Sequence, residues 1–315
     1  MTATSAPATI AALDVGTNSV LMLVARVAMD GTVTPLADLA EVTRLGRGVE
    51  RTGSLDPESS ARTLATLERF IAVARDLGAE RIVTAATSAL RDARDGVAFI
   101  EKLQRSAGVT LQIISGELEA QLNYLAAARD PKTGAEHPLL IVDIGGGSTE
   151  LIASQPGAPL RVASLQIGSV RLTERLIKHD PPSAQERKQV EEVVEREIAE
   201  LGWQDFKARR LVGVAGTVTT ICALALGLAQ YDSGRVHGAW LERAQVDAVT
   251  ERLFSLTTAE RRRLPTMVAG RADVICAGAV ILSRTIACFD QAGVIVSDRG
   301  VRWGLLYREL SRLGY

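Results

Sequence analysis

The segment Ala12–Ser19, which reads ALDVGTNS, carries most of the information about the architecture, because Ile141–Ser148, IVDIGGGS, has the same pattern. In both copies an apolar run ends in an aspartate, with a glycine two positions later and a serine five positions later. A second apolar stretch follows, at 20–27 and at 151–153. The pattern predicts a β-hairpin with a small polar tip. Two copies predict two similar domains whose tips face one cleft.

The rest of the chain has the pattern of a mixed α/β protein. Asp56 and Pro57 are suited to the N-cap and the first position of a helix. The polar segment 129–134 predicts a connector, so we divide the chain into domains 1–130 and 131–315. Further strands are expected at 33–42, 81–86, 111–114, 139–143, 160–166, 210–214 and 294–297, and helices at 57–77, 92–105, 117–128, 183–201, from 217, at 272–289 and at 301–313.

Length and composition restrict the classes of protein. The 315 residues suit two domains, and a net charge of −1 gives no basic field of the kind that nonspecific nucleic-acid binders use. Three widely spaced cysteines and no signal peptide in residues 1–9 predict a cytoplasmic protein. The uncharged segment 211–231 contains glycines and a turn, so we interpret it as a buried strand and helix and expect no membrane span.

The two turns have the chemistry of a phosphate site. Backbone N–H groups in a glycine-rich turn can bind phosphate oxygens closely, and serine and threonine add hydroxyl donors. The aspartate before each turn would repel a bare phosphate, which indicates a divalent cation between them, Mg²⁺ or alternatively Mn²⁺. A tight hairpin that needs glycine only for its conformation is the simpler alternative. The candidate phosphate-binding residues are Gly16, Thr17, Asn18, Ser19, Gly145, Gly146, Gly147 and Ser148, and the candidate metal ligands are Asp14, Asp143 and Glu150.

Eight segments taken in order are similar to one known family. They read DVGTNS (14–19), RLGRGVERTGSL (44–55), ATSALRDA (86–93), SGELEA (115–120), DIGGGSTE (143–150), GVAGTVTT (213–220), RADVICAGAVIL (271–282) and SDRGVRWGLL (297–306). The chain resembles the exopolyphosphatase and guanosine pentaphosphate phosphohydrolase family, within the superfamily of actin, hexokinase and sugar kinases. The resemblance implies an α/β fold of two duplicated ribonuclease-H-like, actin-like ATPase domains with an interdomain cleft.

The resemblance also implies a reaction and its residues. Water would hydrolyse the terminal phosphoanhydride of polyphosphate, or of a guanosine pentaphosphate alarmone, with a divalent metal. Glu119 corresponds to the catalytic carboxylate, which orients and deprotonates the water. The family usually has a second glutamate directly before it, where this chain has Leu118. Arg91 corresponds to a phosphate-contacting arginine, and the match of DIGGGSTE assigns Asp143 and Glu150 to the metal.

Several alternatives remain open at this stage. A kinase or ATPase of the same superfamily would use GVAGTVTT to bind adenosine, and a non-catalytic sensor would bind an alarmone without turnover. Arg271 and Arg299 suit either a polyanion path or structural ion pairs, and His137, His179 and His237 are interpreted as surface or packing residues. The chain ends soon after the last motif, which implies a preference for short polyphosphate. The apolar segment 272–289 suits a homodimer contact as well as a core.

Overall fold

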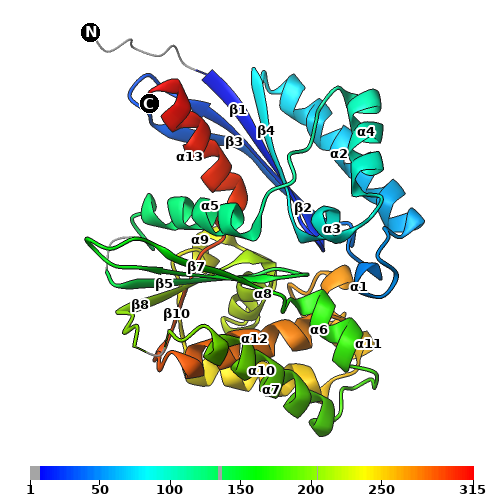
Figure 1. Ribbon diagram of the computed structural model, residues 1–315, viewed down its shortest axis with the longest axis vertical. Helices are drawn as coiled ribbons and strands as arrows, with labels where there is room; N and C mark the ends of the chain where they lie inside the picture. Colours follow the sequence, from blue (N-terminus) through cyan, green and yellow to red (C-terminus); the bar gives the residue numbers. More distant parts are fainter. Residues whose placement is uncertain (1–7, 134–136, 204) are drawn as a thin grey trace. The chain divides into compact units, whose positions relative to one another are not determined.

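The computed structural model describes residues 8–133, 137–203 and 205–315, which form two units (Figure 1). Unit 1 contains the chain up to Ala126 together with Val301–Tyr315, and unit 2 is Ala127–Gly300. This differs from the division at 130/131 mainly at the C-terminus, where the last helix packs its apolar face on the first sheet. The N-terminal residues 1–7 and the predicted connector residue Gly134 lie outside the described ranges.

Unit 1 is built on a four-stranded sheet in the order β3-β2-β1-β4 (Figure 1). The predicted hairpin is confirmed, because β1 and β2 pair antiparallel up to Val15↔Val20, and β4 runs parallel to β1 on its other side. The strands are β1 (Ala8–Val15), β2 (Ser19–Val27), β3 (Val33–Val42) and β4 (Arg81–Ala86), and the helices are α1 (Val49–Thr52), α2 (Pro57–Asp76), α3 (Ser88–Asp92), α4 (Gly96–Ala107), α5 (Gly116–Ala128) and α13 (Val301–Leu313).

Alternation along β1 divides the core of unit 1 between the two faces of the sheet. Ala11 and Leu13 belong to one apolar cluster, with side chains of α2 and α4. Ile10 and Ala12 belong to the other, with side chains of α5 and α13. This is the two-residue period of a strand that is buried on both faces.

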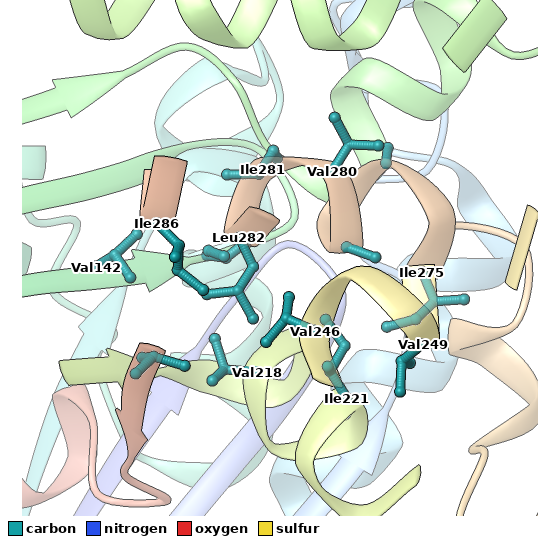
Figure 2. Packing of buried hydrophobic residues seen from close by; sticks show 14 of the residues in the cluster. Val142, Val218, Ile221, Val246, Val249, Ile275, Val280, Ile281, Leu282 and Ile286 are labelled. Atoms are coloured by element: carbon teal, nitrogen blue, oxygen red, sulfur yellow. The ribbon is translucent and has the colours of Figure 1, made fainter. Parts of the chain in front are cut away.

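Unit 2 contains a six-stranded sheet in the order β7-β6-β5-β8-β10-β9. Its largest apolar cluster joins one face of the sheet to α7, α8, α10 and α12, and Figure 2 shows Val142 of β5, Val218 of α8 and Ile286 of α12 within it. The strands are β5 (Leu139–Ile144), β6 (Thr149–Ser154), β7 (Arg161–Leu165), β8 (Arg210–Val214), β9 (Trp240–Glu242) and β10 (Gly293–Val296), and the helices are α6 (Ser169–Leu176), α7 (Ala184–Glu200), α8 (Ala215–Ala225), α9 (Ser233–Val236), α10 (Arg243–Ser255), α11 (Thr258–Arg261), the 3₁₀ turn η1 (Ala269–Arg271) and α12 (Ile275–Cys288).

The two sheets share one topology, as the repeated hairpin predicts. The order β3-β2-β1-β4 corresponds to β7-β6-β5-β8, with two antiparallel pairings followed by a parallel one in each unit. In unit 2 the strand β10 extends the parallel part beside β8. The equivalent position of unit 1 is occupied by the segment predicted as a strand at 111–114, which makes only the bridge Ile113↔Ala86 beside β4.

Two predicted helices have different limits in the structure. The helix expected at 92–105 corresponds to α4, which begins only at Gly96, whereas Asp92 is the last residue of the separate helix α3. Between the two helices Asp95 accepts a hydrogen bond from the Leu55 N–H, and a Cβ on Gly96 would lie 2.4 Å from the Leu90 oxygen. The helix expected at 272–289 begins at Ile275. Its side chains are buried in the core of unit 2, which was one of the two uses considered for this segment. Among the described residues, no helix has the length and apolarity needed to cross a membrane, and 211–231 contains β8 and α8 as expected.

Candidate functional site

The first glycine-containing turn joins β1 to β2 and is held by hydrogen bonds and packing contacts with the segment that follows β3. The Gly16 N–H donates to the Ser19 oxygen at 2.9 Å and closes the turn. The Asn18 oxygen accepts from the N–H groups of residues 43 and 44, and the Thr17 oxygen accepts from the Gly46 N–H. A Cβ on Gly46 would lie 2.2 Å from the Thr17 methyl carbon, so the segment 43–47 packs directly on the turn.

The second turn joins β5 to β6 and is held in the same way by the start of α6. The Gly145 N–H donates to the Ser148 oxygen at 3.0 Å. The oxygens of Gly145 and Gly146 accept from the N–H groups of residues 169–171. A Cβ on Gly168 would lie 2.3 Å from the Gly146 oxygen, so only glycine fits at this point of contact.

These contacts determine where the N–H groups of the turns point. In a planar trans peptide the oxygen of one residue and the N–H of the next point in opposite directions. Because the oxygens of Gly145 and Gly146 point to α6, the N–H groups of Gly146 and Gly147 point away from it. Consecutive N–H groups on one side of a turn suit an anion. The N–H groups of Gly16 and Gly145 differ from the expectation, since they close the turns.

The residues before the turns differ between the two units. Asp143 faces Glu150 across β5 and β6, and a carboxylate oxygen of one lies within 4.8 Å of a carboxylate oxygen of the other. Both side chains are buried, and the Ser164 hydroxyl donates to Glu150 Oε1 at 2.7 Å. Two buried carboxylates side by side favour a proton or a cation between them, so their oxygens fit a divalent metal. In unit 1 the buried Asp14 faces Leu21 instead.

Unit 1 holds the predicted catalytic carboxylate beside the predicted arginine. Glu119 lies in the first turn of α5 and is 7% exposed. Arg91, on α3, has its Nη1 3.8 Å from Glu119 Oε2, and the same nitrogen donates to the Ile114 oxygen at 2.9 Å. The turn is linked to α3 by a 2.6 Å hydrogen bond between the Thr17 and Ser88 hydroxyls. Arg91 is therefore a half-buried residue that can orient Glu119.

Arg271 of η1 lies against the start of α8 in unit 2. Its guanidinium donates to the Thr220 hydroxyl at 2.6 Å, and a Cβ on Gly216 would lie 2.3 Å from it. Burial lowers the pKa of Arg271 to about 10, so the side chain keeps its positive charge at neutral pH. The two roles considered for Arg271 stay predictions.

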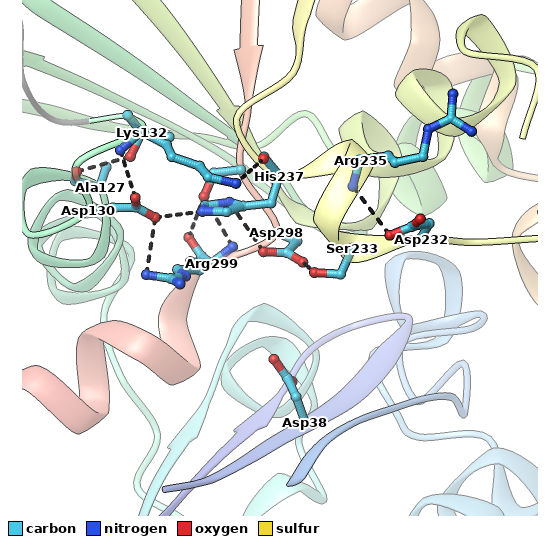
Figure 3. A network of polar contacts seen from close by, with 12 residues as sticks. Asp38, Ala127, Asp130, Lys132, Asp232, Ser233, Arg235, His237, Asp298 and Arg299 are labelled. Carbon is cyan, nitrogen blue, oxygen red and sulfur yellow. Dashed lines mark hydrogen bonds and ion pairs between the residues drawn. The ribbon is translucent and has the colours of Figure 1, made fainter. Parts of the chain in front are cut away.

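His237 and Arg299 belong to a cluster that ties the start of unit 2 to its end (Figure 3). The two ring nitrogens of His237 lie 2.8 Å from Asp130 Oδ2 and 3.3 Å from Asp298 Oδ1, and Arg299 Nη1 lies 3.3 Å from Asp130. Burial by itself would raise the pKa of Asp130, but the His237 ring and the Lys132 N–H outweigh burial and lower it. The structural ion pair considered for Arg299 is thus present.

The fold and the two turns define a protein of two duplicated α/β units, each with an anion-compatible turn. Residues 23–313 match the model of the Ppx/GppA phosphatase family, and the chain belongs to that family. Exopolyphosphatase 2 of Mycobacterium tuberculosis is 36% identical over 285 residues, which cover 87% of this chain and 88% of the relative. The crystal structure of the Aquifex aeolicus Ppx/GppA family member has a TM-score of 0.82 and 32% identity, covering 98% of this chain and 99% of that one.

A further relative has a different name and a greater length. Guanosine-5'-triphosphate,3'-diphosphate pyrophosphatase of Vibrio atlanticus is 31% identical over 310 residues, which cover 98% of this chain but 60% of the relative. The family and the duplicated actin-like fold predicted from the motifs are confirmed. The roles of the individual site residues stay predictions.

The residues that pack on the two turns were not predicted from the sequence. Gly46 lies inside a quoted motif, but nothing in that motif indicates a contact with Thr17. Gly168 and Arg171 lie outside the quoted motifs. Only their position could have indicated these contacts, because each segment that packs on a turn follows the third strand of its unit.

Proposed function

We propose that the protein is an exopolyphosphatase, which hydrolyses the terminal phosphoanhydride of inorganic polyphosphate. The observation that supports this most directly is the 36% identity to an exopolyphosphatase over most of both chains. Guanosine pentaphosphate is the second candidate substrate, because the Vibrio atlanticus pyrophosphatase is 31% identical and shares almost the whole of this chain. Free buried Cys222 and Cys276, whose thiol pKa burial raises to about 11, suit a cytoplasmic location.

In the proposed mechanism each unit has a defined task. The outward N–H groups of Gly146 and Gly147, with the Ser148 hydroxyl, bind phosphate oxygens in unit 2. Thr17, Asn18 and Ser19 do the same in unit 1. Stabilising the charge that develops on these oxygens is usually the largest contribution to phosphoryl transfer.

The carboxylates supply the remaining chemistry. Asp143 and Glu150, with Asp14 as a further candidate, would hold Mg²⁺ or Mn²⁺, which neutralises charge on the phosphates when bound. Glu119 orients the attacking water and accepts its proton. Arg91 keeps the carboxylate of Glu119 in position.

The experiment that tests the proposal compares substrates. We would measure phosphate release from tripolyphosphate, long-chain polyphosphate and guanosine pentaphosphate at equal concentrations of terminal phosphate, with Mg²⁺, with Mn²⁺ and with excess EDTA. Polyphosphate hydrolysis that depends on the metal is expected, and the chain-length preference follows from the same data. Labelling of an acceptor without phosphate release would indicate a kinase, and binding without turnover would indicate a sensor.

Two variants of α5 test the catalytic carboxylate. Glu119→Gln should lower kcat by about 10²- to 10⁴-fold, the range typical of a general base, while substrate binding is retained. Glu117→Gln is the matched control, because Glu117 is exposed in the same helical turn. Equal activity of Glu119→Gln and the wild type would show that the assignment of Glu119 is wrong.

A further inference from the structure

The second turn contains three successive peptide groups whose oxygens point to the same side. The Gly145 oxygen accepts from the Ser169 N–H at 3.0 Å, and the Gly146 oxygen accepts from the N–H groups of Val170 and Arg171 at 2.9 and 3.1 Å. The third oxygen is that of Gly147, and it accepts from the Nε of the Arg171 side chain at 2.7 Å. Two of the peptides are therefore held by backbone and the third by a side chain.

The orientation of the third peptide group depends on its contact with the side chain. Gly147 lacks a Cβ, so its backbone can rotate with little steric resistance, and the peptide between Gly147 and Ser148 can turn over. In the observed orientation its oxygen points to Arg171 and the Ser148 N–H points the opposite way. In the reversed orientation the Gly147 oxygen would point to the anion side and repel a phosphate oxygen.

We propose that Arg171 is a positioning residue, which aims the Ser148 N–H at the substrate phosphate by holding the Gly147 oxygen. The inference rests on the proposed function, since it takes the bound group to be a phosphate of polyphosphate. Arg171 is charged, so its hydrogen bond to the oxygen is stronger than one between neutral groups. The role is exerted through the peptide group, without contact between Arg171 and the reacting atoms.

The atom that donates makes a sharp test possible. Glutamine carries its amide nitrogen at the same number of bonds from Cα as the Nε of arginine, so Arg171→Gln can keep the hydrogen bond while it removes the charge. Lysine has a carbon at that place, so Arg171→Lys keeps the charge and loses the donor. Arg171→Met loses both.

The test measures kcat and KM for phosphate release from tripolyphosphate. Arg171→Gln should stay within about threefold of the wild type, whereas Arg171→Lys and Arg171→Met should lower kcat by about tenfold or more, as expected for a displaced donor to a developing charge. Arg175→Met is the matched control, because Arg175 is exposed one turn further along α6. Near-normal activity of Arg171→Lys with loss in Arg171→Gln would indicate direct charge contact and overturn the proposal. Equal loss in all three variants, or no loss in any, would also overturn it.

Amide NMR separates this proposal from the function on which it rests. We would titrate wild type, Arg171→Gln and Arg171→Met with inorganic phosphate and follow the signals of Gly146, Gly147 and Ser148. The Ser148 signal should shift in wild type and Arg171→Gln and respond weakly in Arg171→Met, whichever phosphoanhydride the enzyme cleaves. Absent phosphate release from every substrate would contradict the proposed function alone, while equal Ser148 shifts in the three proteins would contradict the positioning role alone.

Discussion

Gly168→Ala is the substitution that most directly perturbs the second turn. The new Cβ would lie 2.3 Å from the Gly146 oxygen and 2.6 Å from the Gly147 carbonyl carbon, and all of these atoms belong to backbone. Ordinary contacts begin at 3.4 Å, so the turn and the start of α6 must separate by about 1 Å, the difference between the two distances. A shift of that size breaks the 2.9 Å hydrogen bond from the Val170 N–H to Gly146.

The expected magnitudes follow from this displacement. Overpacking of a tight contact typically costs about 1–3 kcal/mol, and each lost hydrogen bond costs about 0.5–1.5 kcal/mol, so the free energy of unfolding should fall by about 2–4 kcal/mol. A displacement of about 1 Å in a group that orients substrate can lower the rate about 10²-fold. Urea unfolding measures the first effect, and kcat/KM for tripolyphosphate measures the second.

Gly202→Ala separates damage to the turn from general destabilisation. Gly202 follows α7 with φ +67° and no neighbouring atom within 4 Å of its Cβ position, so alanine there strains the backbone without touching the turn. It should lower stability by about 1 kcal/mol and leave the rate per folded molecule unchanged. A Gly168→Ala enzyme with wild-type kcat/KM would refute the reasoning that α6 positions the turn.

Three further predictions concern stability, each measured by urea unfolding. Burial alone would raise the pKa of Glu186, but the N–H groups of Ser183 and Lys178 outweigh burial and lower it to about 2. The resulting stabilisation, at most about 3 kcal/mol, is complete above about pH 4.5 and is lost as the pH falls towards 2, so Glu186→Gln should be destabilised at pH 7 but match the wild type near pH 2. His237→Ala should lower the free energy of unfolding by about 3 kcal/mol, because Asp130 and Asp298 both lose their contact with the imidazole ring. An unchanged unfolding midpoint would show that the cluster contributes nothing to stability. Gly304→Ala should lower the free energy of unfolding by about 1–3 kcal/mol, because its Cβ would lie 2.1 Å from a backbone oxygen of α5. Normal stability of this variant would mean that α5 and α13 separate easily.

The hairpins were predictable because their signals are local. An apolar run, a small polar tip and a second apolar run lie within about twenty residues. The helix start at Asp56 and Pro57 was also local, since the Asp56 side chain accepts from the Ser59 N–H. Repetition of one local signal was sufficient to predict the duplication.

The contacts that hold the turns could not be predicted in this way. Gly168 meets Gly146 only after β6 and β7 have brought the chain back to the tip of the β5–β6 hairpin. The place of α13 is a similar case, because its packing on β1 joins the two ends of the chain. Such contacts depend on tertiary arrangement, and no periodicity within either segment encodes them.

The differences between the two turns separate the features that belong to the duplicated fold from those that belong to one unit. Both turns close with the same hydrogen bond, from Gly16 to Ser19 and from Gly145 to Ser148, so the closure belongs to the shared topology. The carboxylate pair does not, because Asp143 faces a glutamate whereas Asp14 faces Leu21. A divalent cation favours the unit in which two buried carboxylates already lie together, since one cation then offsets both charges. We therefore predict that the carboxylate pair of unit 2 contributes more to metal binding than Asp14 of unit 1 does.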